Sequence, residues 1–562
     1  MSLAPSPPPL STPWTTATLL QIRTSKMQPM QGLTTTTGIY KQPQHGRIFC
    51  GPEGFENDEH DLTFHGGPDK AVHQYFPGHY PNWQSEFPDH DGNFEVGGFG
   101  ENLVAKGTGG GGEMNERNVC IGDVVGIGGE VVLQVSLPRQ PCFKLNHRFG
   151  LKGFAPNTWR LSRTGWDYRV LKTGWVSPGD EITLAERKHP AWTIERIQEY
   201  LHRNTGDLEK LEELAAVPEF GRECKRGFAW LIERIHEKAK AKTKVKEPEV
   251  FTSWTVVEKK KETTRITKFV LQCDAHDDEG AGIPPGGFVR LRLPNGLLRS
   301  YSIVHGTRNR LTLGIARDAQ SRGGSTYLHD HINLASKLDV GAINPSIPMV
   351  ESASNHVFIA GGIGITAFLG HCNLMKSINY SFTLHLAVRS EADIPFQGAL
   401  EGLGPRVRVY RGDQGERLDA RDILGGRSWN SMTYVCGPER LVSAVQAAAE
   451  ALSLADEEIY YEAFGARVGG DPFAVSVKGQ GEKKVEVGET ESLLEALRGG
   501  GWSVDSSCEV GNCGTCKVRV CGGSTGEVEH RGSGLTKGEK AEGELLSCVS
   551  RGRMGAHLVL EW

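Results

Sequence analysis

The chain has 562 residues, enough for about three or four domains, and its 38% hydrophobic and 23% charged content is typical of globular domains. Because the net charge is −5 and no apolar run is as long as a membrane span, we expect neither nucleic acid nor membrane binding. Outside one C-terminal group the twelve cysteines lie singly, which favours a reducing, cytoplasmic location over a disulfide scaffold.

The N-terminal half divides into four segments by composition. Met1–Thr16 is rich in Pro, Ser and Thr and lacks the apolar core of a signal peptide, so we expect a disordered tail. Short β-segments such as Val124–Ile127 and Val131–Val135 follow between glycine turns, and apolar residues at helical spacing then predict two or three short helices. The lysine-rich run Lys238–Lys246 predicts a solvated linker. The expected segments are a tail with the first strand, a β-rich domain, a helical extension and the linker, at residues 1–33, 34–190, 191–237 and 238–249.

The C-terminal half divides into three further domains. Alternating strands predict a small antiparallel barrel; they are expected at residues 252–257, 264–271, 288–293 and 310–315. Buried-type strands at His356–Ala360, Thr383–Ala387 and Thr433–Cys436, separated by helical stretches, predict a parallel α/β sheet. The expected bounds are 250–350 for the barrel, 351–468 for the α/β domain and 469–562 for the last domain.

Four cysteines in the last domain carry the most specific motif of the chain. Four residues separate the first two of them, two residues separate the next pair, and the fourth lies well downstream; they are Cys508, Cys513, Cys516 and Cys548. This is the plant-type spacing for a [2Fe–2S] cluster. The alternative is a structural zinc site, but such sites usually offer two short cysteine pairs, whereas Cys548 stands alone. The spacing therefore favours the iron–sulfur cluster.

Two motifs upstream have the residue types that hold a flavin and a nicotinamide nucleotide. In Arg299-Ser-Tyr-Ser302 the Arg can bind a phosphate, the Tyr can pack on a flavin ring and the Ser can hydrogen-bond its N5. A second glycine turn with a serine follows at Gly323–Ser325. The glycine-rich stretch Ala360–Thr366 follows a buried strand and opens a helix, as a pyrophosphate-binding turn does. Cys436-Gly437 then ends the third buried strand.

In this order, the motifs resemble the ferredoxin–NADP reductase superfamily. With the cysteine domain at the C-terminus, they are most similar to its phthalate dioxygenase reductase and vanillate demethylase reductase branch, over about 250–562. The resemblance implies an antiparallel flavin barrel, an α/β nicotinamide domain and a β-grasp ferredoxin domain. It also implies FMN rather than FAD, with NADH or NADPH as the electron donor. It assigns FMN binding to Arg299, Tyr301, Ser302 and Ser325, and nucleotide binding to Gly362, Gly364, Thr366, Cys436 and Gly437.

The N-terminal half resembles the MOSC domain. Several blocks match in order, at residues 37–41, 61–75, 99–103, 121–123 and 138–145. The match covers about 34–236 and is closest to the bacterial branch with an appended three-helix region. It implies a β-rich MOSC barrel that binds a molybdenum cofactor. It also implies that Cys142 is the catalytic thiolate on the metal, with Arg139 at the cofactor phosphate and His65 nearby. Although a lone cysteine is most often a small buried hydrophobe, the Pro-Arg-Gln-Pro turn before Cys142 favours the ligand role.

Together the resemblances imply a chain of electron carriers in one polypeptide. The leading hypothesis is a self-sufficient NAD(P)H-dependent reductase that passes electrons from NAD(P)H to FMN, the [2Fe–2S] cluster and the molybdenum cofactor, reducing N-hydroxylated small molecules. Two alternatives remain. In the first, the C-terminal half donates electrons to a separate acceptor protein, a Rieske-type oxygenase. In the second, the MOSC half is a non-catalytic cofactor- or sulfur-binding module.

Overall fold

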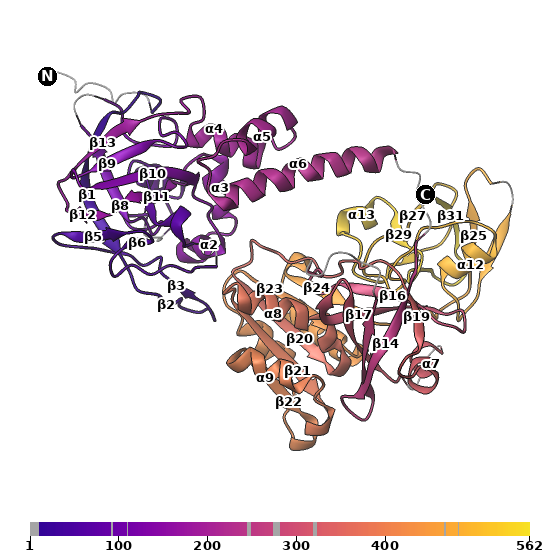
Figure 1. Cartoon of the computed structure of the whole chain (residues 1–562). Helices are drawn as coiled ribbons and strands as arrows, with labels where there is room; N and C mark the ends of the chain where they lie inside the picture. Colours follow the sequence, from indigo (N-terminus) through magenta and orange to yellow (C-terminus); the bar gives the residue numbers. More distant parts are fainter. Residues whose placement is uncertain are drawn as a thin grey trace.

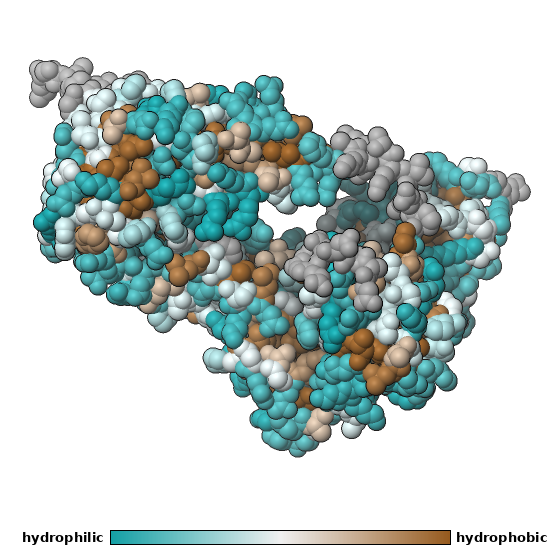
Figure 2. All heavy atoms as spheres, in the orientation of Figure 1, coloured by the Kyte–Doolittle hydropathy of each residue, from teal (hydrophilic) through white to brown (hydrophobic). Residues whose placement is uncertain are grey.

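The computed structural model describes residues 10–562, with gaps at 64, 91–93, 109–110, 244–248, 274–281, 319–322, 466–467 and 481–482. It has four domains and a helical extension, as expected (Figure 1). None of the described helices is long and apolar enough to cross a membrane. On the face in Figure 2 hydrophilic residues dominate, and apolar residues form scattered patches.

The first domain is a closed β-barrel, as the MOSC resemblance implied. Its strand order is β13-β9-β10-β11-β7-β8-β1, and pairing of β13 with β1 closes it. The strands are β1 (Thr16–Thr24), β7 (Val72–Gln74), β8 (Leu103–Gly107), β9 (Val124–Ile127), β10 (Val131–Pro138), β11 (Trp166–Lys172) and β13 (Glu181–Glu186). Short strands flank it: β2 (Gln28–Pro29), β3 (Thr36–Thr37), β4 (Gln42–Pro43), β5 (Ile48–Gly51), β6 (Gly54–Phe55) and β12 (Gly174–Val176). The helices are η1 (Pro68–Lys70), α1 (His79–Glu86), α2 (Phe143–Phe149) and α3 (Phe154–Arg160).

The chain enters this barrel earlier than expected. Residues 1–9 lie outside the described part, but Leu10–Thr16 is not the disordered segment expected there. Trp14 is 1% exposed within the barrel core, and the carbonyl oxygens of Leu10 and Thr12 accept hydrogen bonds from Asn118 Nδ2. Because one buried tryptophan anchors a Pro- and Ser-rich segment, composition alone misassigned it.

The helical extension packs on the barrel, and its last helix is longer than expected. It contains α4 (Ile194–Gln198), the π-helical turn η2 (Glu199–Arg203), α5 (Leu208–Ala215) and α6 (Arg222–Thr243). Ile194, Ile197, Leu211 and Leu214 are buried in the barrel core, as the periodicity predicted. Helix α6 continues through the first residues of the expected 238–249 linker, because Ala and Lys favour helix. Residues 244–248 lie outside the described part.

The second domain is a closed antiparallel barrel of order β14-β15-β18-β17-β16-β19, with helix α7 between β18 and β19, and it confirms the expected flavin-type barrel. The elements are β14 (Thr252–Lys261), β15 (Ile266–Gln272), β16 (Phe288–Arg292), β17 (Leu298–Thr307), β18 (Arg310–Ala316), α7 (Gly324–His331) and β19 (Lys337–Val340). Arg299–Ser302 lies within the first half of β17.

The third domain is a five-stranded parallel sheet of order β22-β21-β20-β23-β24 with helices between the strands, as predicted. Its strands are β20 (Asn355–Gly361), β21 (Phe382–Val388), β22 (Val407–Arg411), β23 (Ser431–Cys436) and β24 (Ile459–Glu462). Its helices are η3 (Gly362–Ala367), α8 (Leu369–Ser377), η4 (Glu391–Asp393), α9 (Gln397–Leu403), η5 (Gly404–Arg406), η6 (Gly412–Gln414), α10 (Ala420–Gly425), α11 (Glu439–Ala451) and η7 (Asp456–Glu458).

The fourth domain has the mixed sheet of a β-grasp fold, in the order β26-β25-β31-β27-β29. Its elements are β25 (Phe473–Val477), β26 (Lys484–Val487), α12 (Leu493–Gly499), β27 (Lys517–Val520), β28 (Val528–Glu529), α13 (Lys537–Ala541), β29 (Glu544–Leu546), β30 (Arg551–Gly552) and β31 (His557–Glu561). Figure 1 places the first domain against the third, with the fourth domain farther along the molecule.

Candidate functional site

A cavity of about 70 Å³ in the first domain brings the three predicted MOSC site residues together. Cys142, Arg139 and His65 all line it, and His65 Nε2 lies 3.2 Å from Cys142 Sγ. Cys142 directly precedes α2, with extended backbone that ends the Pro-Arg-Gln-Pro turn. The turn and the helix therefore fix the thiol at the cavity wall.

Four cations face this cavity, and three of them already have carboxylate partners. The ion pairs are Lys41–Asp58, Lys70–Glu223 and Lys144–Asp61. Arg139 is 9% exposed, and within the described part of the chain it forms no ion pair and its Nη1 has no hydrogen-bond partner. A buried, unsatisfied cation is costly unless an anion completes it, and guanidinium suits phosphate. The residues therefore fit a phosphate-bearing cofactor such as a molybdenum pterin.

Two of the histidines that line the cavity, His65 and His73, are neutral at physiological pH. Burial, and then the neighbouring cations, holds the pKa of both His65 and His73 well below the usual range. A neutral imidazole carries one N–H, so His65 can donate to the sulfur of Cys142 without adding charge.

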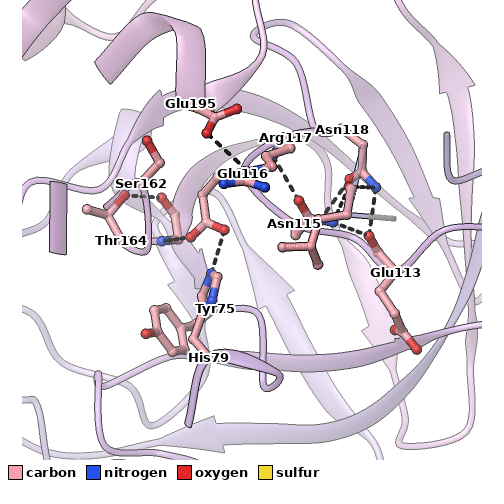
Figure 3. A network of polar contacts seen from close by, with 12 residues as sticks. Tyr75, His79, Glu113, Asn115, Glu116, Arg117, Asn118, Ser162, Thr164 and Glu195 are labelled. Atoms are coloured by element: carbon pink, nitrogen blue, oxygen red, sulfur yellow. Dashed lines mark hydrogen bonds and ion pairs between the residues drawn. The ribbon is translucent and has the colours of Figure 1, made fainter. Parts of the chain in front are cut away.

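A network of polar contacts surrounds Glu116 in the first domain (Figure 3). Glu116 accepts hydrogen bonds from His79 Nε2 and from the Gly165 N–H, both at 2.7 Å. Gly165 has a φ of 75°, and a Cβ there would approach His73 Nε2 to 2.8 Å. Glu116 thus fixes the turn that leads into β11, whose Asp167 lines the cavity.

A second cavity of about 130 Å³ lies between the MOSC domain and the parallel-sheet domain. It shares His65, Cys142 and Lys144 with the first cavity, while Ile378 and Tyr380 of the parallel-sheet domain form its opposite wall. Cys142 therefore stands between a cation-lined cavity and one that a second domain closes. No sequence pattern indicated this second wall.

The predicted flavin residues gather around β17 and the N-terminus of α7. Arg299 and Tyr301 are two residues apart and therefore lie on the same face of β17, and Ser302 lies on the opposite face. A Cβ on Gly324 would lie 2.7 Å from Arg299 Cγ, so the arginine lies against the first turn of α7, where Ser325 is found. A cation beside a helix N-terminus fits a phosphate group.

The predicted nucleotide residues converge at the carboxyl edge of the parallel sheet. The glycine turn after β20 packs backbone to backbone on the end of β23, because a Cβ on Gly364 would clash with the Cys436 carbonyl and one on Gly437 would lie 2.9 Å from the Gly361 nitrogen. Gly362 has a φ of 52°. Thr366 Oγ1 donates to the Ile363 carbonyl at 3.0 Å and thereby holds the turn.

Glu462 is a candidate functional residue that the sequence did not single out. It ends β24 beside Cys436, where burial raises its pKa to about 7. Ser346 Oγ donates to it at 2.8 Å, and the next residue, Ala463, accepts from Asn512 of the cysteine loop. A titratable carboxyl thus lies between the nucleotide turn and the cysteine loop. A glutamate in a strand ordinarily indicates an exposed face of the sheet. Hydrophobic periodicity therefore did not predict that Glu462 is buried.

The four predicted cluster cysteines form two pairs. Cys516 Sγ lies 3.2 Å from Cys548 Sγ. The backbone N–H of Cys513 points at Cys508 Sγ at 3.4 Å, and that of Cys508 at Cys513 Sγ at 3.5 Å. Two irons bridged by sulfide need two thiolates each. Cys521 follows β27 and its Sγ instead contacts the Arg519 carbonyl.

Comparison with known proteins identifies both ends of the chain. Residues 61–183 match the model of the MOSC domain, and residues 475–552 match that of the 2Fe-2S iron-sulfur cluster binding domain. This confirms the iron–sulfur assignment over the zinc alternative.

Three relatives extend the similarity. A reductase of Gibberella moniliformis is 33% identical over 573 residues, which covers 98% of this chain and 96% of the relative. The heme-dependent oxidative N-demethylase beta subunit of Ectopseudomonas mendocina is 34% identical and covers 50% of this chain and 89% of its own length. The phthalate 4,5-dioxygenase oxygenase reductase subunit of Pseudomonas putida is 32% identical and covers 54% of this chain and 94% of its own.

Proposed function

The chain belongs to the family of its full-length relative, the Gibberella moniliformis reductase, and from this premise we propose that it is a self-sufficient reductase whose C-terminal half supplies electrons to a substrate site in its own MOSC domain. One observation carries the proposal. Cys142 stands between a cavity lined by four cations and a cavity with room for a small molecule, in a chain that also has an electron-transfer module. Fusion raises the effective concentration of the donor.

The substrate class proposed is N-hydroxylated compounds. The overall reaction is R–NHOH + NADH + H⁺ → R–NH₂ + NAD⁺ + H₂O: the N–O bond breaks, NADH provides both electrons and the oxygen leaves as water. When bound, a molybdenum cofactor supplies a centre that exchanges two electrons with such a bond. Cys142 would hold the metal, because thiolates are suitable soft ligands, and Arg139 the phosphate. Neutral His65, 3.2 Å from the sulfur, would orient the thiolate.

The electron supply rests on residues of the other three domains. Arg299 and the first turn of α7 form one phosphate cradle, which suits FMN with its single phosphate. The turn at Gly362–Gly364 and Cys436-Gly437 would hold NADH or NADPH. The four cysteines from Cys508 to Cys548 would hold the [2Fe–2S] cluster, which matches the family model of this domain.

The domain arrangement adds a requirement. The MOSC domain contacts the amino ends of the parallel strands, for example at Ser381, whereas the cysteine loop contacts their carboxyl ends at Ala463. Strands β20 and β21 have seven residues each, and at roughly 3.3 Å per residue each is about 23 Å long. We propose that electron delivery to Cys142 involves movement of the MOSC domain relative to the reductase half, or delivery by a second molecule. Turnover per molecule that rises with protein concentration would identify the second route.

The experiment that tests the function compares two activities of one variant. Cys142→Ala should leave NADH-driven reduction of ferricyanide or cytochrome c unchanged, because Cys142 lies outside the reductase domains. The same substitution should abolish reduction of a hydroxylamine or amidoxime. Full N-hydroxy reductase activity in Cys142→Ala would contradict the proposal and favour a reductase that serves a separate oxygenase.

A further inference from the structure

A turn of the parallel-sheet domain is hydrogen-bonded directly to the MOSC site. Ile378–Ser381 joins α8 to β21, and Asn379 has a left-handed φ of 51° that points its side chain out of the turn. Asn379 Nδ2 donates to Asp61 Oδ2 at 2.8 Å and to the Thr36 carbonyl at 3.0 Å. Ser381 Oγ accepts from the Thr34 N–H at 2.9 Å. The turn is thus held on both sides of its tip.

The carboxylate that Asn379 contacts also holds a cavity lysine. Lys144 Nζ lies 2.6 Å from Asp61 Oδ2, and both side chains are under a tenth exposed. Lys144 lines both cavities beside Cys142. The hydrogen bond from Asn379 therefore couples the position of the turn to the wall of the site.

Tyr380, at the tip of the turn, forms part of the wall of the second cavity. Its ring lies 4.5 Å from the ring of Phe143, the residue that follows Cys142. Tyr380 and Ile378 form the wall opposite Cys142, and the remaining lining includes the polar residues Gln140, Glu223 and His65. Removing the tyrosine ring would join this cavity to the space between the domains.

The second cavity is small. Its volume of about 130 Å³ is well below the roughly 300–1,000 Å³ of typical ligand sites. It is also slightly below the size of roughly 150 Å³ at which an engineered protein cavity accepts benzene. A compound that bears a ring plus a functional group therefore exceeds it, whereas hydroxylamine or a compound with a few heavy atoms fits.

We propose that the Ile378–Ser381 turn closes the MOSC cavity when the two domains are docked, and that Tyr380 sets the largest molecule that reaches Cys142. The closure stands on the contacts alone. The chemical class, small N-hydroxylated compounds, rests on the proposed function.

Alkylation of Cys142 tests the closure without any activity. Protein purified without molybdenum is treated with iodoacetamide or with the bulky fluorescein maleimide, and the Cys142 peptide is quantified by mass spectrometry. Tyr380→Ala should speed maleimide labelling of Cys142 by about tenfold or more. Tyr380→Phe, which keeps the ring, should match the wild type. Cys521, in the ferredoxin domain, is the internal control and should be labelled at the same rate in every variant.

A maleimide rate at Cys142 that is unchanged in Tyr380→Ala would overturn the proposal. Asn379→Ala offers a second variant that leaves the tyrosine in place. It should also speed maleimide labelling, because the turn loses its contacts to Asp61 and Thr36. Cytochrome c reduction at the wild-type rate shows that the reductase half, which contains the turn, is folded in each variant.

Substrate preference tests the class. The ratio of kcat/KM for benzamidoxime to that for hydroxylamine should rise about tenfold or more in Tyr380→Ala and stay constant in Tyr380→Phe. An equal ratio in all three proteins would contradict a size limit at Tyr380. If no protein reduces either compound while the labelling difference is found, the proposed function fails and the closure stands.

Discussion

Replacing Arg139 by methionine should weaken anion binding in the MOSC cavity and at the same time stabilise the unloaded protein. Arg139 is 9% exposed and has an unsatisfied Nη1 among the described residues. A buried cation without a counter-ion costs free energy, and methionine removes the charge while filling similar space. In the presence of a phosphate, the substitution removes a charge-assisted contact of about 1.5–3 kcal/mol, which is roughly a 10- to 150-fold loss of affinity.

A matched control separates this effect from the loss of any buried arginine. Arg187 Nη2 lies 2.6 Å from the carboxylate of Asp123, whose side chain is fully buried. Arg187 does not line the cavity. Arg187→Met should therefore destabilise the MOSC domain by about 3–5 kcal/mol, because it leaves a buried carboxylate unpaired, and should not alter anion binding.

The assay is calorimetry on protein purified without molybdenum. Titration with inorganic phosphate or pyrophosphate gives the affinity, and scanning calorimetry gives the midpoint of the MOSC transition. We expect Arg139→Met to lower the affinity and raise the midpoint, and Arg187→Met to lower only the midpoint. If Arg139→Met lowers the midpoint as much as the control does and leaves phosphate affinity unchanged, then Arg139 is a structural arginine and the reasoning is refuted.

Three further predictions concern the cluster, the flavin and the pH dependence. Cys548→Ser should bleach the visible iron–sulfur absorption while flavin stays bound, and Cys521→Ser should not; the opposite result would reassign the fourth ligand. Heat-released flavin should be FMN by chromatography, and Arg299→Ala should lose it; finding FAD would contradict the single phosphate cradle. Burial raises the pKa of Asp167 from 3.8 to about 7, so the folded state holds this proton more tightly than the unfolded chain does. MOSC stability should therefore fall by up to about 4 kcal/mol as pH rises from about 4 to 7. Asp167→Asn should flatten that slope in thermal unfolding scans, and an unchanged slope would rule Asp167 out as its source.

Local sequence signals predicted the fold of each domain, and they singled out residues that the structure brings close together. Periodicity identified the barrel strands and the parallel sheet, because each of these elements buries one face or both. Short motifs predicted that Arg299 and Ser325 act together, and likewise Gly364 and Cys436. Such motifs can be recognised because their glycine turns bring the backbone close to a neighbouring segment. The lysine-rich run after Glu237 led to a wrong boundary between helix and linker, because the same Ala and Lys residues suit both a solvated linker and a helix.

What the sequence could not predict depends on contacts between distant segments. Asn379 and Asp61 are 318 residues apart, and neither lies in a pattern that indicates a domain interface. Tyr380 and Glu462 gain their roles from burial by other domains. Such contacts have no period and no local motif, so only the folded chain reveals them.

Molybdenum analysis of the purified protein tests the central claim most directly. Iron and molybdenum are measured by mass spectrometry in the wild type and in Cys142→Ala, both produced in cells that make the cofactor. The account predicts about one molybdenum atom for every two iron atoms in the wild type, and loss of molybdenum with unchanged iron in Cys142→Ala. Wild-type protein with full iron and flavin but no molybdenum would contradict the account.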